Sequence, residues 1–150
     1  IGANNSLDAA GALIEYGYIY EPMFADNSIR EKVLSDLALQ TYIGINRFFG
    51  DEKKLSAHKY ETSLLPSRWD NTLRRGTKDS EEVLALQAAL AVEKLFPPEG
   101  FDKRDCPLAG NFGDCTRLAL TQFQKKHSLT SELGYVGQAT LNKLNELFSR

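Results

Sequence analysis

The chain contains 150 residues, of which 42% are hydrophobic and 25% charged, and its formal net charge is −2. This length allows one ordinary domain or two small ones, and the charge balance argues against a nucleic-acid-binding protein, which usually has a basic face. No apolar run is long enough to span a membrane. Because the first residue is Ile1 rather than Met, we expect a trimmed or mature chain, and the lack of a signal peptide does not bear on secretion.

Two helices are predicted in residues 6–50. Ser6 can cap a first helix with apolar residues at helical spacing as far as residue 18, and Pro22 closes that segment. Ser28 and Glu31 have the spacing of a capping box, which predicts the start of a long second helix. Gly50 is expected to end it.

The predicted second helix is apolar over much of its circumference, so more than one neighbour must cover it. We expect these neighbours within the same chain, in a helical bundle, and the alternative is self-association or another protein partner. Residues 53–64 favour a weaker third helix, and residues 66–71 are typical of a linker. We therefore predict a small helical domain of unknown role over residues 1–72.

Three further helices are predicted in residues 73–150. Asp79 to Glu82 supply a cap and acidic first-turn residues for the first of them, and Pro97 and Pro98 are expected to stop it. Each helix carries apolar residues at helical spacing, which indicates an all-α fold with a shared core. These residues are Val83, Leu86 and Leu90; Ala119 and Phe123; and Leu141, Leu144 and Phe148.

A seven-residue pattern, Gly-x-apolar-Gly-x-x-Thr, occurs twice, at residues 110–116 and 134–140. Two glycines around one apolar residue suggest a tight turn, because glycine adopts positive φ without a Cβ penalty. The apolar residue is expected to point inward, and the threonine falls in the first turn of the helix that follows. Two copies in register indicate a domain built by internal duplication.

With the residues around these copies, the sequence resembles the bacterial peptidoglycan-binding domain family. The motifs LRRG (73–76), VLALQAAL (83–90), GNFGDCT (110–116), ALTQFQKKHSL (119–129) and GYVGQATLNKL (134–144) stand in the order of that family. Asp114 replaces the proline usual after the first turn, and a long loop, 96–110, separates the first helix from that turn.

The resemblance implies a compact three-helix module over residues 73–150 that binds cell-wall peptidoglycan without catalysis, through stem peptide or glycan. It implies no cofactor and an extracytoplasmic location in the periplasm, in the cell wall or outside the cell. Backbone N–H groups at the helix starts are expected to hold stem-peptide carboxylates. The expected contact residues are exposed ones around the turns: Asn111, Asp114, Gln122, Tyr135 and Gln138.

The only two cysteines are Cys106 and Cys115, both in the second half. We expect a disulfide between them, which fits an oxidising compartment, and two free thiols are the alternative. A closed zinc site needs four ligands, so no metal site is predicted from two cysteines.

Two alternatives to a wall-binding protein remain. One is a protein–protein or oligomerisation adaptor in the cell envelope. The other is a fragment of a wall-lytic enzyme resembling lytic transglycosylases, with Glu15 as a helix-borne general acid among aromatic residues. With only His58 and His127 available, a zinc hydrolase is not expected.

Overall fold

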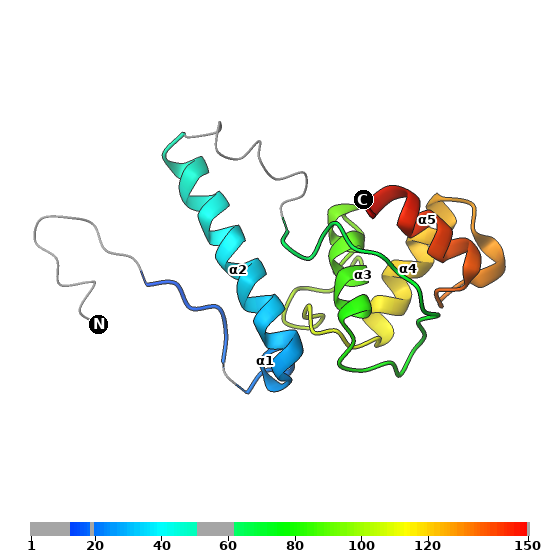
Figure 1. Cartoon of the computed structure of the whole chain (residues 1–150), viewed down its shortest axis with the longest axis horizontal. Coiled ribbons are helices and arrows are strands. Elements are labelled where there is room, and N and C mark those ends of the chain that lie inside the picture. The colour runs from blue at the N-terminus through cyan, green and yellow to red at the C-terminus, as the bar shows by residue number, and fades with distance from the viewer. Residues whose placement is uncertain (1–12, 19, 51–61, 150) are drawn as a thin grey trace, which may run out of the picture.

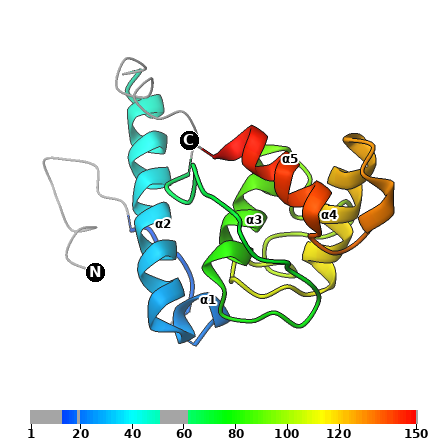
Figure 2. The same ribbon diagram turned by 45° about the vertical axis from the view of Figure 1, so that its right-hand side comes forward.

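The computed structural model describes residues 13–18, 20–50 and 62–149. Within these ranges the regular structure is helical, without a strand, which confirms the all-α prediction. In Figure 1, α2 stands beside a bundle formed by α3, α4 and α5, and the turned view of Figure 2 again places α2 next to α3. The elements are α1 (Pro22–Ala25), α2 (Asn27–Phe48), α3 (Glu81–Val92), α4 (Asp114–Lys126), the 3-10 helix η3 (Thr130–Glu132) and α5 (Gln138–Phe148).

The predicted first helix is wrong where the structure describes it. Residues 13–18 are not helical, and residues 6–12 lie outside the described ranges. Gly17 has φ +146°, and the Tyr18 amide donates to Glu21 Oε1 at 3.0 Å, so the chain turns here instead. Of the predicted third helix, residues 53–61 lie outside the described ranges, and residues 62–64 are not helical.

The long helix α2 begins at a different cap from the predicted Ser28–Glu31 box. Asp26 is the N-cap, and its Oδ1 accepts from the amides of Ser28 at 2.9 Å and Ile29 at 3.2 Å. A carboxylate two residues upstream of Ser28 caps the helix instead, so α2 begins earlier than the predicted box. The helix ends at Phe48, close to the predicted Gly50.

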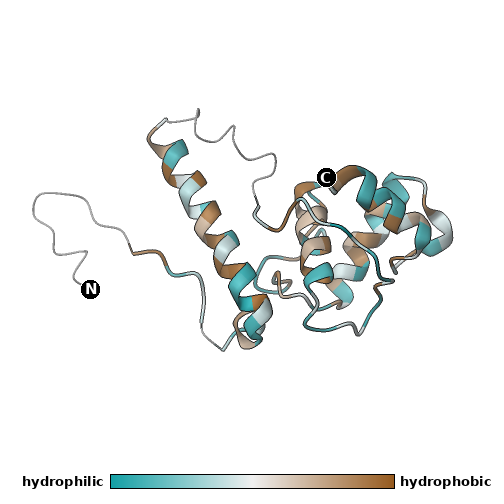
Figure 3. Cartoon of the chain, in the orientation of Figure 1, coloured by the Kyte–Doolittle hydropathy of each residue, from teal (hydrophilic) through white to brown (hydrophobic). Residues whose placement is uncertain are grey.

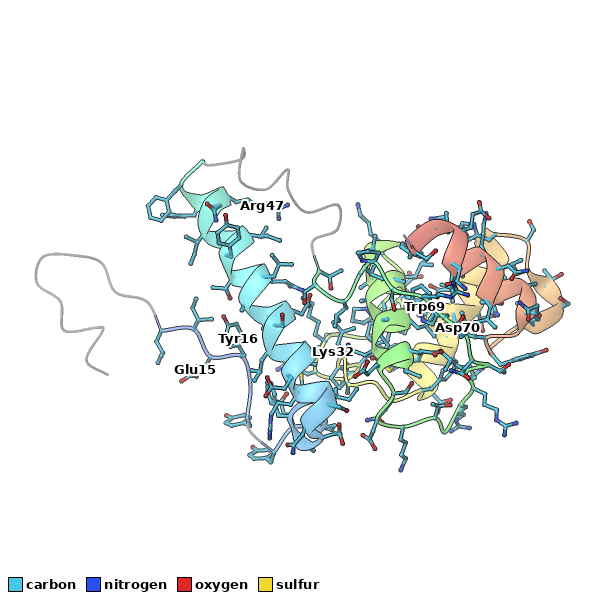
Figure 4. All side chains as sticks on the ribbon, in the orientation of Figure 1. Glu15, Tyr16, Lys32, Arg47, Trp69 and Asp70 are labelled. Atoms are coloured by element: carbon cyan, nitrogen blue, oxygen red, sulfur yellow. A yellow bond between two sulfur atoms is a disulfide. The ribbon has the colours of Figure 1, made fainter. Side chains whose placement is uncertain are left out.

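The N-terminal end of α2 packs on α3. Ile29 and Val33 join Phe24 and Leu84 in a small apolar core, with Leu84 supplied by α3. Lys32 lies 3.0 Å from the Glu81 carboxylate, and Figure 4 shows Lys32 on the side of α2 that faces α3. The long helix α2 is therefore attached to the C-terminal bundle through its first turns.

Asp36 makes a second attachment between α2 and the chain entering the bundle. Its buried carboxylate accepts from the Thr62 hydroxyl at 2.6 Å, the Ser63 amide at 2.7 Å and Gln40 Nε2 at 2.9 Å. A buried charge needs several hydrogen bonds to offset its lost hydration. This cluster fixes where the chain passes from the N-terminal elements to the bundle.

The main core lies among α3, α4 and α5 and contains all the apolar residues predicted for those helices. It also contains Leu65 and Trp69, of which Trp69 lies in the segment 66–71 expected to be a linker. Trp69 is 1% exposed, its indole N–H donates to the Glu82 carbonyl at 2.8 Å, and its backbone exchanges two hydrogen bonds with the Asn145 amide. This segment is thus packed on the bundle, and Figure 4 shows Trp69 among its helices.

Cys106 and Cys115 form a disulfide, as predicted, with their Cα atoms 5.8 Å apart. The bond ties the long loop between α3 and α4 to the first turn of α4. Cys106 is buried in the main core, so the disulfide also fixes part of that core.

Replacing both cysteines with serine is expected to lower the free energy of unfolding by about 2–3 kcal/mol, the effect of closing a short loop in the unfolded chain. Urea unfolding of the variant and of the wild-type chain measures this loss. Wild-type protein treated with a reductant serves as the control and should lose a similar amount. Unchanged stability after complete reduction would contradict the assigned role of the bond.

Candidate functional site

Both copies of the repeated pattern form the expected turns. The first glycine of each copy has positive φ, +68° at Gly110 and +85° at Gly134. The apolar residues Phe112 and Val136 are 2% and 0% exposed. The second glycines are the extended N-caps of α4 and α5, so each turn leads directly into a helix.

A buried glutamine holds the first turn. Gln87, on α3, accepts from the Ala109 and Gly110 amides, both at 3.1 Å, through its Oε1. Its Nε2 donates to the Asn111 carbonyl at 3.1 Å and to the Thr116 hydroxyl at 3.0 Å. The Gln87 amide therefore pairs with backbone groups on both sides of the first turn and with Thr116 in the first turn of α4.

Gln124, on α4, holds the second turn in the same way. Its Oε1 accepts from the Gly134 amide at 2.8 Å. Its Nε2 lies 2.7 Å from the carbonyls of Glu132 and Tyr135 and 2.9 Å from the Thr140 hydroxyl. The duplicated unit is therefore a helix bearing a buried glutamine, a turn, and a threonine in the next helix.

The segment from Leu73 to Thr77 brings the two turns to one edge of the bundle. Leu73 pairs antiparallel with Val136, and the Val136 amide donates to the Leu73 carbonyl at 2.7 Å. A few residues further along the chain, the Gly76 amide donates to the Phe112 carbonyl, and the Phe112 amide donates to the Thr77 carbonyl. One short stretch of chain thus contacts both turns.

Three exposed arginines lie at this edge, which we call the turn surface and define by residues 73–77, 111–117 and 134–138. Asp114 accepts from Arg75 at 3.0 Å and from Arg117 at 3.3 Å. A Cβ added at Gly134 would lie 3.2 Å from Cγ of Arg117, so Arg117 lies between the two turns. Arg74 is exposed on the same segment as Arg75. The ranges that define the turn surface contain these three arginines and one carboxylate, Asp114, and this excess of positive charge favours an anionic ligand.

The two helix starts differ. At α5, the Glu132 carboxylate accepts from the Ala139 amide at 3.1 Å, the Thr140 amide at 3.0 Å and the Thr140 hydroxyl at 2.9 Å. A Cβ on Gly137 would lie 2.5 Å from the carboxyl carbon, so this approach requires glycine. At α4 the N-cap residue Gly113 has no side chain to cap the N-terminus, and Asp114 lies in the first turn.

Glu132→Gln is expected to lower the free energy of unfolding at neutral pH by about 1 kcal/mol, the usual effect of losing a helix cap. Partial burial alone raises the pKa of Glu132. The hydrogen bonds from Thr140 and Ala139 outweigh it and hold the pKa below the usual 4.5. The stabilisation is therefore complete above pH 4.5 and is lost as the pH falls through the lowered pKa.

Urea unfolding across that pH range measures the effect. The difference between wild type and Glu132→Gln should be largest near neutrality and should shrink in acid. A constant difference at every pH would show that the charge of Glu132 is not what stabilises the start of α5.

Three of the five predicted contact residues are exposed on the turn surface. Asp114, Tyr135 and Gln138 lie at the turns or at the helix starts and are exposed. Asn111 is half-buried and its Oδ1 accepts from the Asp79 amide at 3.1 Å, so its side chain supports the turn. Gln122 is exposed on α4 outside the ranges that define the turn surface.

The arginines at positions 74, 75 and 117 were missed by the sequence analysis. The first two stand in the LRRG motif, so a signal was present in the sequence. The pairing of Leu73 with Val136 could not be predicted from the sequence, and this pairing brings Arg74 and Arg75 beside Arg117.

A cavity of about 1110 Å³ is lined by both the N-terminal elements and the bundle. Its walls come from the segment before α1, from α2, from α3 and from the loop that carries Cys106. Glu15 is among the lining residues, and Figure 4 shows Glu15 and Tyr16 on the side of α2 away from Lys32. Glu15 is exposed and lies in a non-helical segment, so the expected helix-borne acid is not present there.

Within the described ranges, no group of three or more His, Cys, Asp or Glu side chains is placed to hold a metal ion. None of the helices in those ranges combines the length and apolar character needed to cross a membrane.

Residues 79–144 match the family model of the putative peptidoglycan binding domain. The resemblance is thereby confirmed over residues 79–144, which contain four of the five motifs, and the C-terminal half of the chain contains a domain of this family. Searches of curated proteins and of solved structures gave no significant match.

Proposed function

Since the C-terminal half contains a domain of the peptidoglycan-binding family, we propose that this chain attaches to bacterial cell-wall peptidoglycan through the turn surface. Binding is non-catalytic, and the N-terminal elements are anchored or targeted to the wall by the bundle. The observation that supports this most is the convergence of both duplicated turns on one segment, with Arg74, Arg75 and Arg117 exposed beside them.

The ligand group that this surface suits best is a carboxylate of the stem peptide. Arg75 and Arg117 are both held by Asp114, which orders their guanidinium groups without neutralising all of the positive charge. An ordered arginine loses less side-chain entropy when it binds a carboxylate. The α5 start is filled by Glu132, so of the two helix starts only that of α4 remains for a ligand.

The exposed neutral residues extend the same surface. Tyr135 is 41% exposed at the second turn, and its ring can cover a sugar or an apolar peptide group. Gln138, at the first position of α5, supplies an amide beside it. One such shallow site binds weakly, and many wall sites raise the overall attachment.

Cosedimentation with purified insoluble peptidoglycan tests the proposal. The full chain is compared with residues 62–150, which keep Leu65 and Trp69 because both belong to the main core. Sedimentation of both with peptidoglycan, and not with cellulose, would support binding by the bundle. Failure of both to sediment with peptidoglycan would contradict it.

An extracytoplasmic location follows from the same proposal. The polymer lies outside the cytoplasmic membrane, and the Cys106–Cys115 disulfide fits an oxidising compartment. Periplasm, cell wall and the extracellular medium all satisfy both conditions.

The wall-lytic alternative now rests on the cavity alone, since Glu15 is not on a helix. Assay of wall lysis by the wild-type chain and by Glu15→Gln separates it from binding. Lysis that is lost in the variant would support an enzyme, and an inactive wild-type chain would remove this alternative.

A further inference from the structure

The outward side of α2 carries an apolar face that the bundle does not cover, and the segment before α1 reaches it where the Tyr16 hydroxyl is hydrogen-bonded to Thr41. Leu34, Ala38, Thr41, Ile45 and Phe48 recur at intervals of four, three, four and three residues, which is the spacing of a coiled-coil seam. The buried residues of α2 occupy other positions around the helix. They are Ile29, Val33, Asp36, Ile43 and Asn46. Figure 3 shows hydrophobic residues recurring along α2 to its C-terminal end.

This outward face is uncharged over several turns. Between Val33 and Asn46 the only charged residue is Asp36, which is buried on the inward side. A solvent-facing helix surface normally carries charges among its apolar residues. Their absence over this length indicates a surface that meets another protein surface rather than water.

The face combines protruding rings with a hollow. Phe48 and Phe49 are 84% and 76% exposed. Beside them, a hollow of about 270 Å³ is lined by Ile14, Thr41, Gly44, Ile45 and the same two phenylalanines. An isologous dimer needs one surface that carries both a projection and its complementary hollow.

The available area is also appropriate for a dimer. Leu34, Tyr42 and Ile45 are 43%, 41% and 50% exposed, and Leu13 and Ile14 from the segment beside α2 are more than half exposed. With the two phenylalanines, they offer on the order of 700 Å² per protomer. Specific interfaces take about 800 Å² from each partner.

From these observations we propose that two copies of the chain pair through the outward face of α2, defined by Leu34, Ala38, Thr41, Ile45 and Phe48 with Tyr42, Phe49, Leu13 and Ile14 beside them. The first turns of α2 stay on α3, so a dimer carries two turn surfaces. This inference stands on the α2 face and does not depend on what the turn surface binds. If that surface binds a repeating polymer, pairing increases attachment through avidity.

Sedimentation equilibrium of the full chain over a concentration series up to about 100 μM tests the pairing. A monomer–dimer equilibrium is expected for the wild type. Ile45→Ser combined with Phe48→Ser should raise the dissociation constant at least tenfold, because it removes exposed apolar area without touching the buried side of α2.

Phe101→Ser is the matched control, since Phe101 is 48% exposed in the loop between α3 and α4 and lies outside the α2 face. It should leave the dissociation constant unchanged, and helix content measured by circular dichroism should be the same in all three proteins. A strict monomer at the highest concentration, or a dimer that the α2 variant does not weaken, would overturn the proposal. Vesicle binding by a monomeric chain would assign the face to lipid instead.

Discussion

Gln124→Leu is expected to lower the free energy of unfolding by about 3 kcal/mol, although leucine fits the apolar surroundings. The substitution removes the acceptor of the Gly134 amide and the donor shared by the Glu132 and Tyr135 carbonyls and the Thr140 hydroxyl. The Gly134 amide and the Tyr135 carbonyl are left partly buried without their partner, and water reaches them only if the turn opens. Urea unfolding measures the loss.

Gln122→Leu is the matched control, because it makes the same chemical change two positions away on the exposed side of α4. Its effect on stability should stay within about 0.5 kcal/mol. Equal effects of the two substitutions would show that the buried amide network does not hold the second turn.

Charge reversal at the turn surface, Arg75→Glu with Arg117→Glu, is expected to reduce peptidoglycan binding at least tenfold. Both guanidinium groups are exposed and lie beside the start of α4, so carboxylates there would repel an anionic stem peptide. Cosedimentation with insoluble peptidoglycan at low and high salt measures the change. Wild-type binding should itself weaken as salt increases.

Lys103→Glu with Arg104→Glu is the control for net charge. It changes the total charge by the same amount at two exposed residues in the loop between α3 and α4. This variant should bind peptidoglycan much as the wild type does, and thermal unfolding should show that both double variants are folded. If the two variants lose binding equally, the turn surface is not the site.

The bundle was predictable from sequence because its determinants are local. The glycines, the inward Phe112 and Val136 and the first-turn threonines act within a few residues, and their repetition shows that they belong together. The apolar spacing of the three helices also predicts which side of each is buried. The buried role of Gln87 and Gln124 depends on turns that follow at different distances along the chain, so it emerged only from the structure.

The predictions from sequence were wrong where a group elsewhere in the chain determined the local structure. Residues 13–18 are not helical, with Gly17 at positive φ among them, and Asp26 takes the cap expected of Ser28. Trp69 appeared to lie in a linker because its partners, Glu82 and Asn145, come from helices later in the chain. The turn surface was only partly foreseen, since Arg75 and Arg117 meet through Asp114 and depend on long-range pairing.

The most direct test of the central claim is an NMR titration of the isotopically labelled full chain with soluble muropeptides. Chitin oligosaccharides, which lack stem peptides, are the control ligand. The proposed function predicts muropeptide-dependent shifts of backbone amides in residues 73–77, 111–117 and 134–138, with little response to chitin oligosaccharides. Shifts confined to residues 13–50, or no shifts at saturating muropeptide, would contradict peptidoglycan recognition by the turn surface.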